Sequence, residues 1–188
     1  MSVTQLDPVT ALVIIDMQKG IVSMPTAQPI NEIIVRSAAL AQAFRAKGLP
    51  VVLVNVAGVA PGRTEAGLRK FAFPPDWTDL APELNQQPGD ILITKHRWGA
   101  FIGTSLDETL RGLGVTQIVL AGVATSIGVE STARSLYDAG YNLALVTDAM
   151  TDRDADAHQY SIEKVFPRLG ETDTTENVLK VVQDLPAR

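Results

Sequence analysis

Short apolar runs, each closed by a polar or glycine-containing segment, recur along the whole chain. They are near-continuous in valine, isoleucine and leucine rather than alternating, and they cover residues 11–15, 51–56, 91–94, 118–121 and 143–147. Runs of this kind are typical of strands buried on both faces, as in a parallel sheet. We therefore predict a parallel sheet that contains these strands.

Between the runs, apolar residues return every three or four positions, which is the period of a helix. This pattern predicts helices over residues 30–44, 104–113, 130–139, 161–169 and 175–185. Thr104 to Asp107 resembles a capping box, and Gly48, Gly114 and Gly140 stand where helices would end. Strand–helix alternation throughout predicts an α/β fold with right-handed crossovers.

One segment departs from this alternation. Residues 58–87 are rich in proline and glycine and include Phe71, Phe73 and Trp77. A long insertion inside a compact domain usually carries function. We expect a lid or a partner surface there.

The length of 188 residues predicts one domain that spans residues 1–188. Hydrophobic residues make up 46% of the chain, which is enough to bury a sizeable core. The formal net charge of −5 disfavours binding to a nucleic-acid backbone. The chain contains no cysteine, which excludes disulfides, thiolate metal sites and a cysteine nucleophile.

The first residues are polar and carry no secretory pattern, and the apolar runs are too short to span a bilayer. We therefore expect a cytoplasmic protein that has no membrane contact. A positive mean hydropathy of +0.12 with few aromatic residues favours additional buried surface, as in a homo-oligomer.

Candidate chemistry lies where the predicted strands end, because ligands of open parallel sheets bind at the carboxyl ends of the strands. Asp16, Asn55, Lys95 and Asp148 stand at or near such ends. Alone, Asp16 is most simply a turn or cap residue and Lys95 a solvated strand end. Together, a carboxylate and an ammonium group at one edge of a sheet can share a cleft that tunes both pKa values for proton transfer.

The segment from Gly122 to Gly128 is a glycine-framed turn from a strand into a helix. The backbone N–H groups of Ala124 and Gly128 are candidate donors of an oxyanion hole. An ordinary connecting loop that uses glycine for steric reasons explains the pattern equally well.

Four motifs together resemble the isochorismatase-like (cysteine hydrolase) superfamily, in its order and over essentially the whole chain. They are Leu-Val-Ile-Ile-Asp-Met-Gln around Asp16, Ile-Thr-Lys-His-Arg-Trp-Gly-Ala-Phe around Lys95, Gly-Val-Ala-Thr-Ser-Ile-Gly-Val-Glu-Ser-Thr-Ala-Arg over 122–134, and Val-Thr-Asp-Ala-Met over 146–150. The resemblance implies a three-layer α/β/α sandwich with a six-stranded parallel sheet, usually assembled as a homo-oligomer. It also implies hydrolysis of a small molecule without a cofactor.

In most of these hydrolases an Asp, a Lys and a Cys form the catalytic set, and the resemblance assigns the first two to Asp16 and Lys95. The nucleophile position falls on Gly128, which carries no side chain and can form no acyl-enzyme. Some isochorismatases of the family share this glycine and cleave a vinyl ether, with the Asp as general acid. The resemblance therefore implies vinyl-ether hydrolysis of the isochorismate type.

Other interpretations stay open. A homologue that lost its nucleophile could bind a ligand or act as a scaffold without catalysis, and Gly128 could be an introduced residue. Ser126 or Thr125 could supply a hydroxyl with Asp16 as its base, but neither occupies the position of the sulfur. We expect neither hydroxyl to replace it.

No metal site is expected. The family's metal-binding enzymes carry Asp-x-His after the second strand, where this chain has Asn55-Val-Ala57. Asp152, Asp154 and Asp156 approach a calcium loop, but Ala157 stands at the position that requires glycine, so we expect a solvated loop. Trp98, Phe101 and Arg97 follow Lys95 and are candidates for binding substrate, or else core, interface and surface residues.

Overall fold

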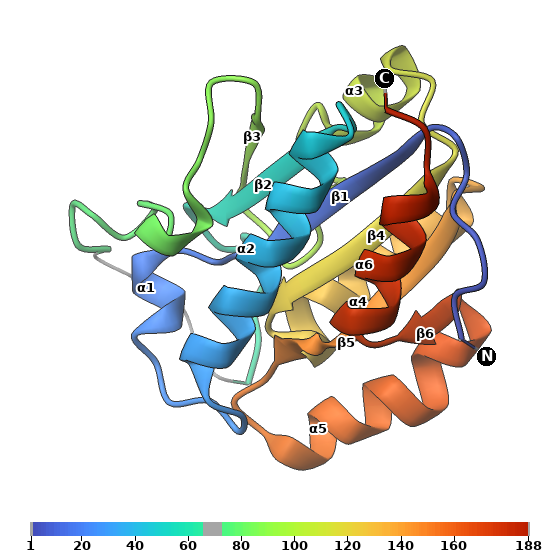
Figure 1. The fold of residues 1–188 in the computed structure, drawn as a ribbon. Helices are drawn as coiled ribbons and strands as arrows, with labels where there is room; N and C mark the ends of the chain where they lie inside the picture. The colour runs from blue at the N-terminus through green and yellow to red at the C-terminus, as the bar shows by residue number, and fades with distance from the viewer. Residues whose placement is uncertain (1, 66–72, 188) are drawn as a thin grey trace.

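The structure is a computed structural model that describes residues 2–65 and 73–187. Its centre is a six-stranded parallel sheet in the order β3-β2-β1-β4-β5-β6 (Figure 1). The strands are β1 (Thr10–Ile15), β2 (Val51–Val56), β3 (Ile91–Lys95), β4 (Gln117–Val123), β5 (Asn142–Thr151) and β6 (Glu171–Asp173). The five predicted strands and the parallel α/β class are confirmed.

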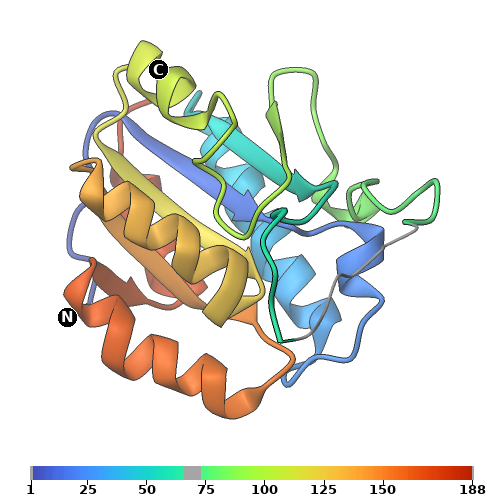
Figure 2. The ribbon, with the colours of Figure 1, turned by 180° about the vertical axis from the view of Figure 1, so that it is seen from behind.

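Helices cover both faces of the sheet. They are α1 (Lys19–Val22), α2 (Ile30–Ala46), α3 (Leu106–Gly112), α4 (Glu130–Asp138), α5 (Ala155–Tyr160) and α6 (Thr175–Asp184). The 3-10 turns are η1 (Pro82–Leu84) and η4 (Phe166–Arg168), and the π-helical turns are η2 (Thr125–Val129) and η3 (Ser161–Val165). Helices α2 and α6 lie on one face and α3 and α4 on the other, so the expected three-layer sandwich is confirmed (Figures 1 and 2).

The near-continuous apolar runs follow from this layering. Leu12 and Ile14 of β1 belong to the core beneath α2 and α6, whereas Val13 and Ile15 belong to the core beneath α3 and α4. Because consecutive side chains of a strand point to opposite faces, a strand covered on both faces needs apolar residues at every position.

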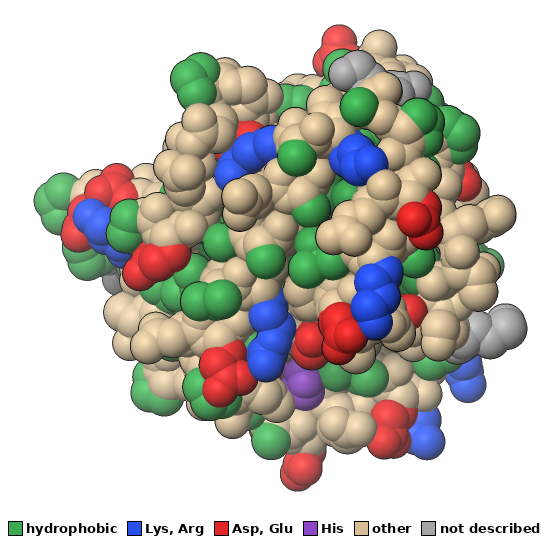
Figure 3. Space-filling model, viewed as in Figure 1, with side chains coloured by type: hydrophobic (Ala, Val, Ile, Leu, Met, Phe, Trp, Pro, Cys, Tyr) green, Lys and Arg blue, Asp and Glu red, His purple; other side chains and the backbone are tan. Residues whose placement is uncertain are grey.

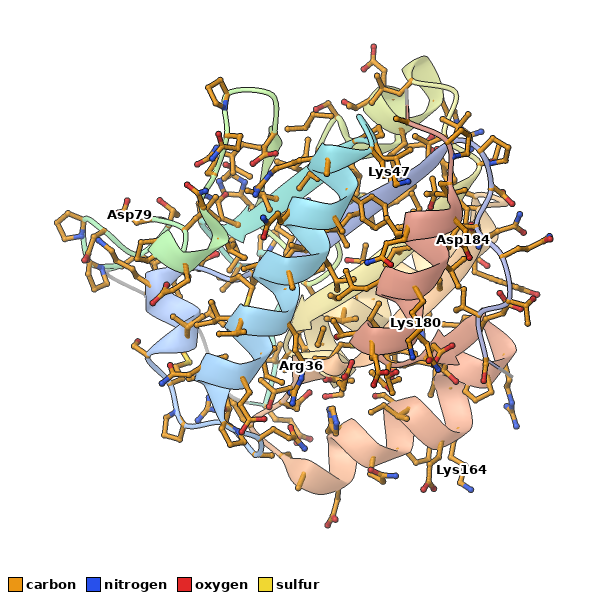
Figure 4. The ribbon with its side chains drawn as sticks, viewed as in Figure 1. Arg36, Lys47, Asp79, Lys164, Lys180 and Asp184 are labelled. Atoms are coloured by element: carbon orange, nitrogen blue, oxygen red, sulfur yellow. The ribbon has the colours of Figure 1, made fainter. Side chains whose placement is uncertain are left out.

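Side chains also join the helices of one layer. Lys47, just past the end of α2, donates hydrogen bonds from Nζ to the carbonyls of Gln183 and Leu185 at the end of α6 (Figure 4). On the outer surface of these helices, Arg36 pairs with Glu32 and Lys180 pairs with Glu176. Acidic and basic side chains are accordingly interspersed over this face (Figure 3).

Two helix predictions need correction. The predicted capping box at Thr104 does not form: the N-cap of α3 is Ser105, whose side chain makes no capping bond. Instead, the Thr104 hydroxyl accepts the N–H of Leu106 and donates to the Ala100 carbonyl. Asp107 pairs with Arg111.

The helix predicted over residues 161–169 begins earlier and is irregular. Asp154 caps α5 by accepting the N–H groups of Asp156 and Ala157, so that the helix starts at Ala155. From Ser161 the chain continues as a π turn and then a 3-10 turn that includes Pro167, which has no N–H to donate.

The proline-rich segment is anchored to the sheet by Trp77. Its indole N–H donates to the Val56 carbonyl at the end of β2. The ring lies so close to Gly20 that a Cβ there would collide with it. Residues 66–72, including Phe71, lie outside the described residues, so the expectation of a lid or partner surface stays a prediction.

Over the described part of the chain, no helix is both long enough and apolar enough to cross a membrane.

Candidate active site

The two predicted strand-end charges form a buried ion pair. Asp16 directly follows β1 and Lys95 ends β3, with β2 between these strands. Lys95 Nζ lies 2.8 Å from Asp16 Oδ2, and the side chains are only 2% and 7% exposed. Their meeting follows from the fold, because the carboxyl ends of parallel strands share one edge.

Lys95 is held in one orientation by its three donors. Besides Asp16, its ammonium group donates to the carbonyls of Arg97, at 3.1 Å, and Trp98, at 2.8 Å. An ammonium group has three N–H bonds, so all of them are used. The side chain therefore presents a stationary positive charge to Asp16.

Burial dominates the acidity of Asp16. It raises the pKa of the carboxyl group to about 6, against the opposing attraction of Lys95 and its hydrogen bond. A carboxyl group with this pKa exchanges its proton close to neutral pH, as a general acid or base requires. Asp16 also has a φ of +52°, a conformation that aspartate tolerates better than most residues.

Gly128 faces the same carboxylate. It is the fourth residue of the π turn η2, which follows β4. A Cβ added at Gly128 would lie 3.2 Å from Asp16 Oδ2 and 3.0 Å from Cγ2 of Ile15. A side chain at position 128 would therefore point directly at Asp16, and this chain has none.

Hydrogen bonds of one side chain connect this turn to the loop that holds Lys95. The Thr132 hydroxyl of α4 donates to the Gly128 carbonyl at 2.7 Å and accepts the N–H of Ala100 at 3.1 Å. Thr132 is fully buried. One side chain thus joins the Gly128 turn to the loop after Lys95.

The hydroxyl of Ser126 is committed elsewhere. Both its hydroxyl and its backbone N–H donate to Oδ2 of Asp152, at 2.8 and 2.7 Å. The expectation of a solvated loop is wrong for Asp152, which is buried, whereas Asp154 and Asp156 are exposed and lead into α5. The other oxygen of Asp152, Oδ1, accepts the N–H groups of Arg153 and Asp154, so hydrogen bonds satisfy both oxygens of the buried carboxylate.

The contacts made by Asp152, by Thr132 and by the pair of Thr125 and His158 were not predicted from the sequence. A usable signal existed for Asp152, because β5 runs on to Thr151 and Asp152 is therefore a residue at a strand end. The predicted strand stopped at residue 147, which placed Asp148 at the end. Asp148 in fact lies inside β5, where its carboxylate accepts the N–H and hydroxyl of Thr175.

The remaining candidates lie around this centre. Trp98 is 66% exposed, Arg97 is exposed, and Phe101 is half-buried against the core beneath α3 and α4. Ala124 precedes η2, its carbonyl accepts the N–H groups of Ile127 and Val129, and the Val123–Ala124 peptide bond is cis.

Asn55 makes its hydrogen bond outside the ion pair of Asp16 and Lys95. Its amide donates to the Thr78 carbonyl, and it lines a cavity of about 670 Å³ together with Lys19, Leu80 and Leu92. Asp16, Lys95 and Gly128 are not part of the lining of that cavity. Within residues 2–65 and 73–187, no group of three or more His, Cys, Asp or Glu side chains is placed to hold a metal ion.

Known proteins resemble this chain over nearly its full length. A profile of the isochorismatase domain matches residues 10–177. The uncharacterized isochorismatase family protein YwoC of Bacillus subtilis is 40% identical over 181 residues, which cover 93% of this chain and 94% of that protein. YecD of Escherichia coli O157:H7, also an uncharacterized isochorismatase family protein, is 37% identical over 180 residues, with 92% and 96% covered.

Solved structures give the same result. An isochorismatase family protein from Burkholderia thailandensis superposes with a TM-score of 0.92 at 41% identity, over 97% of this chain and 100% of that one. N-carbamoylsarcosine amidase from Thermoplasma acidophilum superposes with a TM-score of 0.74 at 28% identity, over 89% and 96%. From the match over residues 10–177 and the similarity to these relatives, we conclude that the chain belongs to the isochorismatase family of hydrolases.

Proposed function

We propose that this protein hydrolyses a small molecule with Asp16 and Lys95 and without a covalent enzyme intermediate, and that the bond it cleaves is a vinyl ether of the isochorismate type. The observation that carries the proposal is the buried ion pair whose carboxylate faces Gly128. Proton-transfer groups are present, and the position that faces them offers no nucleophile. A reaction that starts with protonation fits this arrangement better than one that starts with nucleophilic attack.

In the proposed reaction Asp16 is the general acid. Its proton is transferred to the terminal vinyl carbon, which becomes a methyl group, and the ether carbon becomes an oxocarbenium ion. Water adds to that carbon, and its released proton returns to the Asp16 carboxylate. The resulting hemiketal then separates into a ketone and an alcohol, so that one water is consumed and Asp16 ends protonated.

Lys95 has the role of orienting the carboxyl group and stabilising its charge once the proton has left. Its attraction alone would keep Asp16 ionised, but burial raises the pKa of this carboxyl to about 6. At neutral pH a minor but usable fraction of the Asp16 carboxyl groups is then protonated, which supports the role of Asp16 as an acid.

The N–H groups of Ala124 and Gly128 are proposed to stabilise negative charge on the substrate. Trp98, Phe101 and Arg97 are proposed to contact the remainder of the substrate.

A second candidate is a ligand-binding homologue without catalysis. It is favoured by the narrow space at Gly128, where an added Cβ would already contact Ile15 at 3.0 Å and Asp16 at 3.2 Å. A side chain at position 128 would therefore fit only if its neighbours moved by a few tenths of an ångström. A ureidoacrylate amidohydrolase, RutB of Pseudomonas savastanoi, is 29% identical to this chain, so amides are the natural comparison substrates.

The test is a substrate panel with isochorismate, ureidoacrylate and N-carbamoylsarcosine. Pyruvate release from isochorismate, followed with a lactate dehydrogenase couple, reports vinyl-ether cleavage, and ammonia release reports amide cleavage. We expect pyruvate release by the native chain, its loss in Asp16→Asn, and no ammonia release. Lys164→Met, at an exposed position of η3, serves as the matched control and retains activity.

The outcomes separate the candidates. Ammonia release by the native chain contradicts hydrolysis without a nucleophile. If the native chain releases neither product but binds isochorismate in calorimetry, the non-catalytic homologue is supported. Gly128→Cys adds a thiol beside Asp16; ammonia release by this variant alone indicates that amide hydrolysis in this fold requires the thiol.

We further propose that the protein acts as a cytoplasmic homo-oligomer without a cofactor or metal ion, and that it binds neither nucleic acid nor membranes. Trp98 and Ile102, two large exposed apolar residues four positions apart after Lys95, support an additional buried surface. Analytical ultracentrifugation is the test: we expect a multiple of the 20.1 kDa chain mass, and a monomer would contradict the proposal.

A further inference from the structure

A second buried polar pair lies directly behind the turn that carries Gly128. The Thr125 hydroxyl and Nδ1 of His158 are 2.8 Å apart, and both residues are buried. Thr125 is the first residue of η2 and His158 belongs to α5. The mechanism proposed above uses neither side chain.

The pair is one of two attachments between this turn and the 152–158 segment. Thr125 is joined to His158, and the next residue, Ser126, is joined to Asp152 through its N–H and hydroxyl. Hydrogen bonds also link the segment internally, because Asp154 caps α5 and its carbonyl accepts the N–H of His158. Two successive residues at the start of η2 are thus hydrogen-bonded to α5 and to the segment that precedes it.

Gly128 is three residues beyond Thr125, within the same π turn. Its Cα is close enough to Asp16 that a Cβ there would lie 3.2 Å from Oδ2. The turn therefore forms part of the wall that keeps water from the Asp16 carboxyl. A change in the position of the turn changes the burial of that group.

We propose that His158 is a positioning residue that acts through the Thr125 hydroxyl: it holds the π turn η2 against Asp16 and so keeps that carboxyl buried. The hydroxyl of Thr125 donates to an unprotonated Nδ1, and the ring carries its proton on Nε2. The inference concerns the acidity of Asp16 and does not require that the substrate proposed above is correct.

The state of the ring agrees with this role. Burial lowers the pKa of His158, while the nearby Asp152 carboxylate opposes that effect. A neutral imidazole has one acceptor nitrogen, which Thr125 can use, whereas a protonated ring has none.

The experiment measures the pKa of Asp16 directly, by ¹³C NMR titration of its carboxyl carbon, with Asp16→Asn to assign the signal. Thr125→Val removes the hydroxyl at nearly constant volume, and Thr125→Ser retains it. His158→Phe removes the acceptor, and His158→Asn offers an amide oxygen near the position of Nδ1. Urea unfolding of each variant records its global stability.

We expect Thr125→Val and His158→Phe each to lower the pKa of Asp16 from about 6 toward the ordinary 3.8, by about one unit, a tenfold change in acid dissociation. Thr125→Ser and His158→Asn should retain the native value. The double variant Thr125→Val/His158→Phe should shift it no further than either single change, because both remove the same contact.

An unchanged Asp16 pKa in Thr125→Val and His158→Phe, whatever their stability, overturns the proposal and leaves the pair a purely structural contact. Should these variants not fold, two measurements still decide. A ¹⁵N spectrum of native His158 that shows a proton on Nδ1 at neutral pH contradicts the proposed donor. A lowered Asp16 pKa in the conservative Thr125→Ser variant contradicts the dependence on the hydroxyl.

Discussion

At the scale of single residues, the protonation of Asp16 sets the expected pH dependence of the proposed reaction. Since the acid form is required and its pKa lies at about 6, the rate should fall about tenfold per pH unit well above that value. The measurement is the pH profile of kcat/KM for pyruvate release from isochorismate. A rate that increases from pH 6 to 8 would show that the carboxylate acts as a base instead.

Lys95 is the residue whose removal should disturb Asp16 most. In Lys95→Met the buried carboxyl loses its cation, so its pKa should rise above 6. Above that pKa, the uncompensated charge should reduce the free energy of unfolding by about 3–5 kcal/mol. Urea unfolding at pH 8 measures the loss. Lys19→Met, which removes an exposed partner of Asp79, should change stability little; equal effects of the two would contradict the argument.

Two glycines of the same strand-to-turn segment should respond differently to alanine. At Gly122, φ is +126° and a Cβ would collide with the backbone of Ile15, so Gly122→Ala should not accumulate as folded protein. At Gly128, the nearest contacts of 3.0–3.3 Å require the neighbours to move by only a few tenths of an ångström. Gly128→Ala should therefore fold, with a melting temperature near the native one. Circular dichroism during heating distinguishes the two.

At the scale of elements, the α5 helix illustrates why its start was predicted too late. The 152–156 stretch reads as an acidic loop, yet Asp154 accepts two N–H groups of the first turn and so starts the helix. Removing this cap in Asp154→Ala should lower the free energy of unfolding by about 1 kcal/mol. Asp156→Ala, two residues along the same exposed turn, makes no such bond and is the control. A loss of equal size in both variants would indicate a helix-dipole effect instead.

Strands buried on both faces, such as β1 and β2, could be predicted because their sequences are continuously apolar. The residues at which strands end were harder to predict. Strand β5 extends through Thr147 and Asp148 to Thr151, because Met150 and Thr151 pair with Gly122 and Val123 after an irregularity in the register. Strand β6 has only three residues, too few to leave a period in the sequence.

At the scale of the whole molecule, the buried Asp16 couples stability to pH. Between about pH 4 and 6 the folded protein retains a proton that the unfolded chain has released, because the folded pKa is raised from 3.8 to about 6. The contribution of this group to the free energy of unfolding is therefore full below pH 4 and is lost as the pH rises through 6. The loss amounts to about 3 kcal/mol.

Asp16→Asn has no titrating group at this position and isolates the effect. Between about pH 4.5 and 7.5 the unfolding free energy of the native protein should fall relative to that of the variant. Urea titrations at several pH values measure it, and the other carboxyl groups cancel in the comparison. A difference that is constant with pH would show that Asp16 is not buried as a perturbed acid.

The sequence by itself determined the class of fold, the strand-end positions of Asp16 and Lys95 and the absence of a side chain at residue 128. These properties are local, because strand periodicity and residue type are carried by neighbouring positions. Only the tertiary structure decided that Lys95 would be held by the carbonyls of Arg97 and Trp98, and that His158 would contact Thr125. The Lys95 contacts are local but depend on how the loop after β3 turns back on the strand end. Thr125 and His158 are distant in sequence, and only the packing of α5 against η2 brings them together.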